Sequence, residues 1–299
     1  MKLISFEKNG QIRVGAIVSS GSAGGEQRVI DVTGMGGISS MNALIENYAT
    51  CKPLLDAAVK EAQSSVPLSD VTLLAPIPDV RRNVFCVGKN YIEHAHEFSG
   101  SGFDSSAAAG AIPKAPIIFS KPPTSVSGPG AAIDSSLDPM QTVDYEAEFA
   151  VVIGKAGRFK EGDDPQSFVF GYTLVNDVTS RGLQKHHSQW LLGKGIDGFC
   201  PMGPTLITAD EVSSVADLEI SCEVNGELRQ KAKLADLIFD IPTLIKTIGR
   251  SISFVPGDVI ATGTPVGVGL GFTPPKYLVS GDVVRVSMAE IGVLENPVI

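Results

Sequence analysis

The chain has 299 residues, of which 43% are hydrophobic and 19% charged, so it can bury a sizeable core in one large domain or in a large and a small one. Its 24 lysines and arginines against 33 acidic residues give a formal net charge of −9. Proteins that bind nucleic acid need a basic surface for the phosphates, so this class is excluded. No apolar run reaches the roughly 18 residues of a membrane helix, and charge at Lys2, Glu7 and Lys8 argues against a signal peptide and against a membrane partner.

Residues 1–78 predict a small N-terminal α+β domain. Prolines 76 and 78 restrain the chain after the last of its strands, which places a boundary near 78–82 and a second domain at 79–299. The predicted elements of the first domain are strands at 2–6, 13–18, 29–32 and 71–75 and helices at 41–48 and 53–63.

Residues 79–299 predict one continuous, strand-rich α+β domain, because 32 glycines and 19 prolines favour many turns. A stretch rich in Gly, Ser and Ala at 99–112 predicts either a lid or an inert linker. The predicted strands are 83–87, 117–120, 145–153, 168–175, 218–224, 258–262 and 283–288, and the predicted helices are 90–97, 180–185 and 241–248.

Two of the four histidines lie in the predicted helix at 90–97. His94 and Glu97 are three residues apart, so one helical turn places them side by side. A carboxylate that holds an imidazole makes a general base near neutral pH. The alternatives are a metal pair formed by His94 and His96 on a strand, or a surface helix whose histidines have no function.

Two glutamates, Glu146 and Glu148, interrupt the apolar strand at 145–153. Successive side chains on a strand point to opposite faces, so the two carboxylates share one face. Adjacent carboxylates that enter a core repel each other and lose their hydration. A bound divalent cation is the simplest remedy, since hard cations prefer carboxylate oxygens.

Asp177 follows the predicted strand at 168–175 and precedes a predicted helix. It is either the N-cap of that helix or a third metal carboxylate, and three carboxylates suit Mg²⁺, Mn²⁺ or Ca²⁺ better than Zn²⁺. Arg181 and Gln184 share a face of the helix, which is either a solvated surface or part of a site.

Lys194 stands between two glycines in an apolar setting, as either an exposed turn residue or a cation that approaches a pocket closely. The glycines at 263, 267 and 269 either form a plain strand-to-loop turn or let backbone N–H groups approach an anionic ligand.

Seven segments in order make the chain resemble the fumarylacetoacetate hydrolase family, in particular its smaller bacterial-type members. The matching segments are G-K-N-Y-x-x-H-x-x-E (88–97), P-I-I-F-S-K-P-P-T-S (116–125), D-Y-E-A-E (144–148), G-Y-T-L-V-N-D-V-T-S-R-x-x-Q (171–184), G-K-G-I-D-G-F-C-P-M-G-P (193–204), V-N-G-E-L-R-Q (224–230) and G-D-V-I-A-T-G-T-P-V-G-V-G (257–269).

The resemblance implies a mixed β-sandwich roll and a homodimer. It implies that Mg²⁺ or Mn²⁺, with Ca²⁺ as a possible substitute in crystals, is held by Glu146, Glu148 and Asp177. It further implies a water-activating dyad of His94 and Glu97 on a lid, and Lys194 at the reacting centre. The substrate contacts that it implies come from Arg181, Gln184, Thr264, Lys121 and Gly263.

Two departures from the family pattern argue against fumarylacetoacetate itself as substrate. A fourth carboxylate ligand that the larger enzymes carry has no match here. Where many relatives read T-A-R-D, this chain has Gly182 after Arg181, and the missing acid predicts a looser helix around Arg181.

The leading functional hypothesis is a metal-dependent hydrolase that cleaves a C–C bond in an acylpyruvate-like keto acid, using dyad-activated water and a stabilised enolate. The alternatives are an oxaloacetate decarboxylase or a 2-hydroxymuconate-type keto–enol isomerase on the same scaffold, and a non-catalytic binding module. Four cysteines without a C-x-x-C pair indicate free thiols and a cytoplasmic protein.

Overall fold

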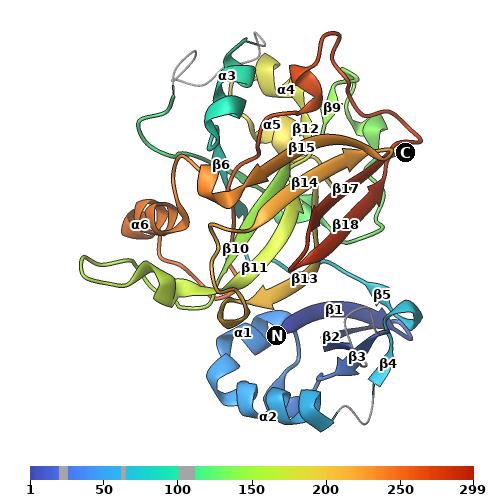
Figure 1. Cartoon of the computed structure of the whole chain (residues 1–299), viewed down its shortest axis with the longest axis vertical. Helices are drawn as coiled ribbons and strands as arrows, with labels where there is room; N and C mark the ends of the chain where they lie inside the picture. The colour runs from blue at the N-terminus through green and yellow to red at the C-terminus, as the bar shows by residue number, and fades with distance from the viewer. Residues whose placement is uncertain (20–25, 62–64, 101–111) are drawn as a thin grey trace.

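The computed structural model describes residues 1–19, 26–61, 65–100 and 112–299, and a twelve-stranded sheet is its largest feature (Figure 1). Ten strands follow one another across it in the order β4 (Ser65–Pro67), β3 (Gln27–Asp31), β2 (Gln11–Ser19), β1 (Lys2–Lys8), β13 (Cys200–Thr208), β11 (Val169–Asn176), β10 (Ala147–Ile153), β16 (Val259–Ala261), β6 (Val84–Gly88) and β7 (Ile117–Lys121). Two short strands lie off this path, β5 (Thr72–Leu73) beside β1 and β8 (Val126–Ser127) beside β13.

A second, antiparallel sheet packs on the middle of the first. Its order is β15 (Glu227–Lys233), β14 (Glu219–Val224), β17 (Val283–Met288) and β18 (Gly292–Pro297), and a two-stranded ribbon joins β9 (Val143–Asp144) to β12 (Thr179–Ser180). Phe149 of β10 and Ile220 of β14 belong to one buried apolar cluster between the two sheets. The strand-rich α+β fold predicted from the sequence is confirmed.

Six α-helices accompany the sheets in the described part of the chain. They are α1 (Met41–Glu46), α2 (Tyr48–Glu61), α3 (Ile92–Gly100), α4 (Arg181–His186), α5 (Leu191–Lys194) and α6 (Ile241–Ser251). In α6 the apolar residues recur at helical spacing and face the core, and the Asp240 side chain caps its first turn by accepting from Thr243 N at 2.9 Å. None of the described helices combines the length and apolarity that a bilayer crossing requires.

The N-terminal segment is joined to the rest through β1, which pairs antiparallel with β13 at Leu3↔Leu206. A second apolar cluster contains Leu3 and Leu44 together with Val152 of β10 and Met202 of β13. The division into 1–78 and 79–299 stays a prediction. The two segments share a sheet and a core, and Figure 1 shows the N-terminal elements gathered at one end.

One predicted strand begins later in the structure than the sequence suggests. The strand expected at 145–153 begins at Ala147, so Glu146 lies in the short gap between β9 and β10. The alternation still holds, because Tyr145, Ala147 and Phe149 all enter the cluster between the sheets. Of the segment 99–112, residues 101–111 lie outside the described residues.

Candidate active site

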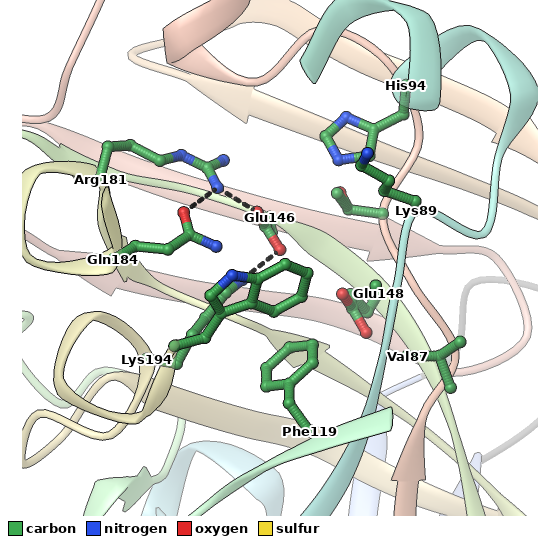
Figure 2. A pocket seen from close by; sticks show the side chains of 12 residues that line it. Val87, Lys89, His94, Phe119, Glu146, Glu148, Arg181, Gln184 and Lys194 are labelled. Carbon is green, nitrogen blue, oxygen red and sulfur yellow. Dashed lines mark hydrogen bonds and ion pairs between the residues drawn. The ribbon is translucent and has the colours of Figure 1, made fainter. Parts of the chain in front are cut away.

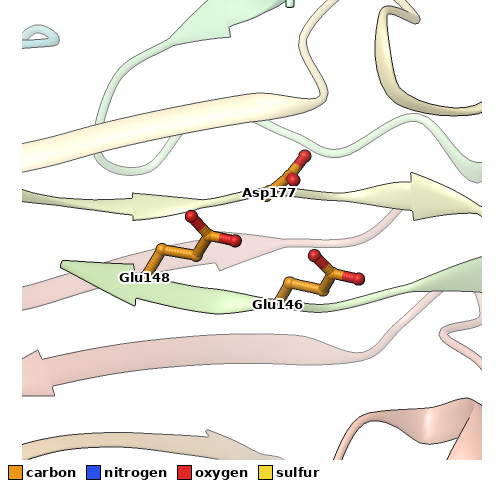
Figure 3. A group of neighbouring side chains, drawn as sticks. All are labelled: Glu146, Glu148 and Asp177. Atoms are coloured by element: carbon orange, nitrogen blue, oxygen red, sulfur yellow. The ribbon is translucent and has the colours of Figure 1, made fainter. Parts of the chain in front are cut away.

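Three acidic side chains lie together where β10 and β11 meet (Figure 3). Glu146 precedes β10, Glu148 lies within it, and Asp177 follows β11. The antiparallel register pairs Ala147 with Asn176, which brings these segments side by side. Carboxylate oxygens of the three residues lie within 4.8 Å of one another, and all three side chains are buried. The positions singled out in the sequence are therefore neighbours in the fold.

Asp177 is not the N-cap of the helix that follows it. That position belongs to Ser180, whose Oγ accepts a hydrogen bond from Leu183 N at 3.3 Å at the start of α4. Instead, an oxygen of the Asp177 carboxylate lies within 4.8 Å of a carboxylate oxygen of each glutamate.

Three buried cations contact this acidic group. Lys194 Nζ lies 2.7 Å from Glu146 Oε2 and 2.7 Å from Asp177 Oδ2, so it bridges the two residues. Lys121 Nζ lies 2.6 Å from Asp177 Oδ1, and Arg181 Nη1 lies 2.6 Å from Glu146 Oε1. Burial disfavours the ionised form of Glu146, but Lys194 and Arg181 outweigh burial and hold its pKa at about 2.

Glu148 is the one of the three acids whose negative charge these cations do not contact. Its Oε2 accepts a hydrogen bond from Gly263 N at 2.9 Å. Burial, and then repulsion from Asp177 and Glu146, raises the pKa of Glu148 well above its usual range. A divalent cation between the three carboxylates would relieve that repulsion, and oxygen donors are what Mg²⁺ and Mn²⁺ prefer. The residues therefore fit such an ion, in competition with Lys194 for oxygens of Glu146 and Asp177.

Arg181 and Gln184 share one face of α4, as the sequence predicts, and Arg181 Nη1 donates to Gln184 Oε1 at 3.3 Å. The expected loosening around Arg181 is not seen. Gly182 N donates to Thr142 Oγ1 at 2.8 Å, and a Cβ at residue 182 would come within 2.5 Å of Met140 Sδ. The missing side chain thus makes room for Met140, and Arg181 is 1% exposed.

His94 and Glu97 are in contact on α3, with His94 Nδ1 and Glu97 Oε2 3.1 Å apart. The other carboxylate oxygen, Glu97 Oε1, accepts a hydrogen bond from Gly267 N at 3.0 Å. If Nδ1 carries a proton towards Glu97, Nε2 of the neutral ring is free of a proton and can act as a base. The helical interpretation of this segment is confirmed, which removes the alternative of a strand-borne metal pair.

Glu146, Glu148 and His94 line one cavity with an empty volume of about 290 Å³, whereas Asp177 and Glu97 are not part of its lining. In the view of Figure 2, Arg181 and Gln184 lie together, apart from His94 and Lys89, and Glu146 lies between the two pairs. The residues that line it are Val87, Gly88, Lys89, His94, Phe119, Glu146, Glu148, Arg181, Gln184, Trp190, Lys194 and Thr264. Three of these carry positive charge against two carboxylates, which favours an anionic ligand.

Two predicted substrate-binding residues lie behind the acidic group and do not line this cavity. Lys121 is fully buried and contacts Asp177 and the Val178 carbonyl oxygen, and Gly263 contacts Glu148 through its N–H. Thr264 lines the cavity, and its Oγ1 accepts a hydrogen bond from Gln230 Nε2 at 2.8 Å. Lys121 and Gly263 thus support the acids, and their direct contact with substrate stays a prediction.

Four residues near the cavity were given no role from the sequence. Trp190 and Phe119 form an edge-to-face pair with ring centroids 5.1 Å apart, and Trp190 packs so closely over Gly88 that a Cβ there would come within 2.6 Å of its ring. Lys89 is 3% exposed with a left-handed φ of 54°, which is uncommon for a residue other than glycine. The fourth is Asp144, a buried partner of Arg181. Lys89, Phe119 and Asp144 fall inside the segments that match the family, and that match was the only sequence signal for them.

The model of the fumarylacetoacetate (FAA) hydrolase C-terminal domain matches residues 83–299. The chain is 46% identical over 231 residues to the oxaloacetate tautomerase YisK of Bacillus subtilis (strain 168), a match that covers 77% of this chain and 74% of that protein. It is 40% identical over 261 residues to the mitochondrial oxaloacetate tautomerase fahd2 of Xenopus laevis, covering 87% and 78% of the two chains.

Solved structures agree over the whole chain. A fumarylacetoacetate hydrolase from Exiguobacterium antarcticum superposes with a TM-score of 0.82 at 39% identity, covering 100% of this chain and 99% of that one. Maleylpyruvate hydrolase from Sphingobium sp. SYK-6, solved with manganese(II) and pyruvate, gives a TM-score of 0.79 at 30% identity with the same coverage. The family model covers most of the chain, and the relatives and solved structures agree with it. The chain therefore belongs to the fumarylacetoacetate hydrolase family.

Proposed function

We propose that the protein is a metal-dependent tautomerase that interconverts the keto and enol forms of oxaloacetate or a closely similar 2-keto dicarboxylic acid. One observation carries the proposal: two carboxylates of the metal-fitting group, a buried lysine and the histidine of the His94–Glu97 pair line a single cavity. Similarity to two oxaloacetate tautomerases supports this alternative over the hydrolase hypothesis.

The reaction moves one proton from carbon to oxygen. His94 Nε2 takes the proton from C3 of the keto acid, and the electrons of that C–H bond form the C2–C3 double bond. The carbonyl π electrons move to the C2 oxygen, which takes a proton from Lys194. Glu97 keeps the imidazole oriented through Nδ1. Return of a proton to Lys194 and loss of one from His94 complete the cycle.

A Mg²⁺ or Mn²⁺ held by Glu146, Glu148 and Asp177 would supply positive charge that stabilises the enolate. The chain itself supplies the ammonium of Lys194, which burial destabilises but Asp177 and Glu146 stabilise more, so its pKa is raised and it stays protonated at neutral pH. The site therefore holds a proton donor and a proton acceptor at the same time.

The charge of the cavity fits a dianion. Arg181 offers a planar donor for one carboxylate, and Lys89 lies apart from it beside His94 (Figure 2). Trp190 and Phe119 add an apolar wall that limits access of water. A small acid with a charge at each end matches this arrangement.

Hydrolysis of an acylpyruvate is the second candidate. The same His94–Glu97 pair could take a proton from water, and the maleylpyruvate hydrolase that resembles this chain was solved with manganese and pyruvate. Decarboxylation of oxaloacetate would pass through the same enolate. Dimerisation and cytoplasmic location stay predictions.

The test supplies the purified protein with Mn²⁺ and measures conversion of enol-oxaloacetate to the keto form above the uncatalysed rate. In D₂O, exchange of the C3 protons by NMR should rise in parallel. His94→Gln should abolish both signals, and His186→Gln, a change in the other histidine pair, should leave them intact. Rapid release of pyruvate from acetylpyruvate without accelerated tautomerisation would instead establish the hydrolase, and pyruvate from oxaloacetate the decarboxylase.

A further inference from the structure

Asp144 is a fully buried carboxylate that ends β9 and lies two residues before Glu146. Its Oδ2 accepts hydrogen bonds from Arg181 Nε at 2.9 Å and from Leu270 N at 3.0 Å. Its Oδ1 accepts from Gly269 N at 2.6 Å and from Tyr145 N at 2.9 Å. The residue thus joins the arginine of the cavity to the backbone of the loop at 267–271.

On the cavity side, Asp144 fixes the orientation of Arg181. The guanidinium donates through Nε to Asp144 and through Nη1 to Glu146, 2.6 Å away. Two carboxylates on two edges of one planar group leave it a single orientation.

On the other side, the loop that Asp144 holds contacts Glu97 of the dyad. Gly267 N donates to Glu97 Oε1 at 3.0 Å, and the Gly267 carbonyl oxygen accepts from Tyr145 Oη at 2.8 Å. A Cβ at Gly271 would overlap the Glu97 carboxylate, so the loop packs closely against that side chain. Any displacement of residues 267–271 therefore displaces Glu97, and with it His94.

We propose that Asp144 is a positioning residue. It holds the substrate-binding Arg181 in one orientation, and it holds the loop at 267–271 against which Glu97 of the His94–Glu97 dyad packs. The roles of Arg181 in substrate binding and of the dyad in proton transfer rest on the proposed function. The contacts do not: one buried carboxylate binds Arg181 on one side and the backbone of residues 269 and 270 on the other.

Asp144→Asn is a sharp probe because every partner of this carboxylate is a donor. An asparagine has one oxygen and one NH₂ group, so either rotamer faces some of those donors with another donor. The shape of the side chain is kept, while either Arg181 or the loop loses its acceptor.

The kinetic test separates the two ends. Asp144→Asn should raise KM about 10-fold through Arg181 and lower kcat about 10-fold through the dyad, the scale of one lost hydrogen bond to a charged group. In an Arg181→Lys background the effect on KM should disappear, and in a Glu97→Gln background the effect on kcat should disappear. If Asp144→Asn still raised KM in the Arg181→Lys background and still lowered kcat in the Glu97→Gln background, each by its full factor, the proposal would be overturned.

Asp258→Asn is the matched control. Asp258 is also buried, and it accepts from Arg82 Nε at 2.8 Å and from Val255 N at 2.8 Å, but neither of these two partners lines the cavity, whereas Arg181 does. Its loss should lower thermal stability while KM and kcat keep their values. A kinetic effect of Asp258→Asn as large as that of Asp144→Asn would show that any buried aspartate does the same.

Two further measurements keep the result independent of turnover and of folding. Oxalate, a planar dianion, should bind the Mn²⁺-loaded Asp144→Asn protein about 10-fold more weakly by calorimetry even if the protein is not a tautomerase. Tyr145→Phe removes only the hydroxyl that holds Gly267, so it should lower kcat and leave oxalate affinity unchanged. Unaltered oxalate binding in Asp144→Asn, or weakened binding in Tyr145→Phe, would contradict the assignment.

Discussion

Four buried carboxylates lie near one another in this protein, and the partner of each decides what it can do. Asp144 is satisfied by Arg181 and backbone donors, Glu146 by Arg181 and Lys194, and Asp177 by Lys121 and Lys194. The Glu148 carboxylate accepts a hydrogen bond from Gly263 N, and within the described part of the chain no cation forms an ion pair with it. Glu148 is therefore the residue whose charge most needs an external cation.

At the residue scale, Glu148→Gln should have opposite effects with and without metal. In EDTA at neutral pH, the variant should have a higher Tm than the wild type. Burial, and then Asp177 and Glu146, raise the pKa of Glu148 on folding, which costs stability above its usual pKa, and a glutamine has no such cost. With Mn²⁺ the order should reverse, since affinity falls by roughly 100-fold or more when a ligand is lost.

Calorimetric Mn²⁺ titration and thermal unfolding in both buffers measure the two effects. Glu219→Gln on the exposed end of β14 serves as the control and should change neither. Undiminished Mn²⁺ affinity in Glu148→Gln would mean that this carboxylate is not a ligand.

At the scale of elements, the sequence was informative where a local pattern decides the structure. The alternation through Tyr145–Phe149 and the i, i+3 spacing of His94 and Glu97 both correspond to observed neighbours. The sequence did not predict the interior strand β13, because Pro201, Gly203 and Pro204 argue against a strand in the middle of a sheet. The fold accepts them because the ladder with β11 is interrupted there, with Tyr172↔Ile207 followed by Leu174↔Gly203.

The contacts of Asp144 and the burial of Lys194 could not be read from the sequence for a different reason. Asp144 meets Gly269 and Leu270, more than 120 residues away, through tertiary packing that no local period encodes. Lys194, in a short helix between glycines, has the local pattern of an exposed turn, and only its two distant acids explain why it is buried.

The contact of α3 with the loop at 267–271 yields a prediction at this scale. Gly271→Ala should displace the Glu97 carboxylate from Gly267 N, since the added methyl group overlaps it. We expect kcat to fall by roughly 100-fold, as for small misplacements of catalytic groups, with Mn²⁺ affinity unchanged. Steady-state kinetics and calorimetry check both statements.

The double variant supplies the control. In a Glu97→Ala background the side chain that causes the overlap is gone, so Gly271→Ala should cost nothing further. An equal additional loss in that background would indicate that residue 271 acts through the backbone and not through Glu97.

At the scale of the whole molecule, the site depends on a sheet that runs through both predicted domains. The cluster that contains Leu3 and Leu44 also contains Cys86 and Ala261, on the strands that lead into the cavity-lining residues 87–89 and Thr264. Disturbing the N-terminal core should therefore reach the site through shared packing.

The expected result is cooperative unfolding of the whole chain. Leu44→Ala, a change in α1 far along the chain from the cavity, should lower the free energy of unfolding by about 2–5 kcal/mol. Trp190 is the single tryptophan and lines the cavity, so its fluorescence reports on the site while far-UV circular dichroism reports on the whole fold. Both signals should shift together to lower denaturant in the variant. If the fluorescence transition stayed in place while part of the circular dichroism signal was lost earlier, residues 1–78 would unfold as an independent domain, and the shared apolar cluster would not couple it to the site.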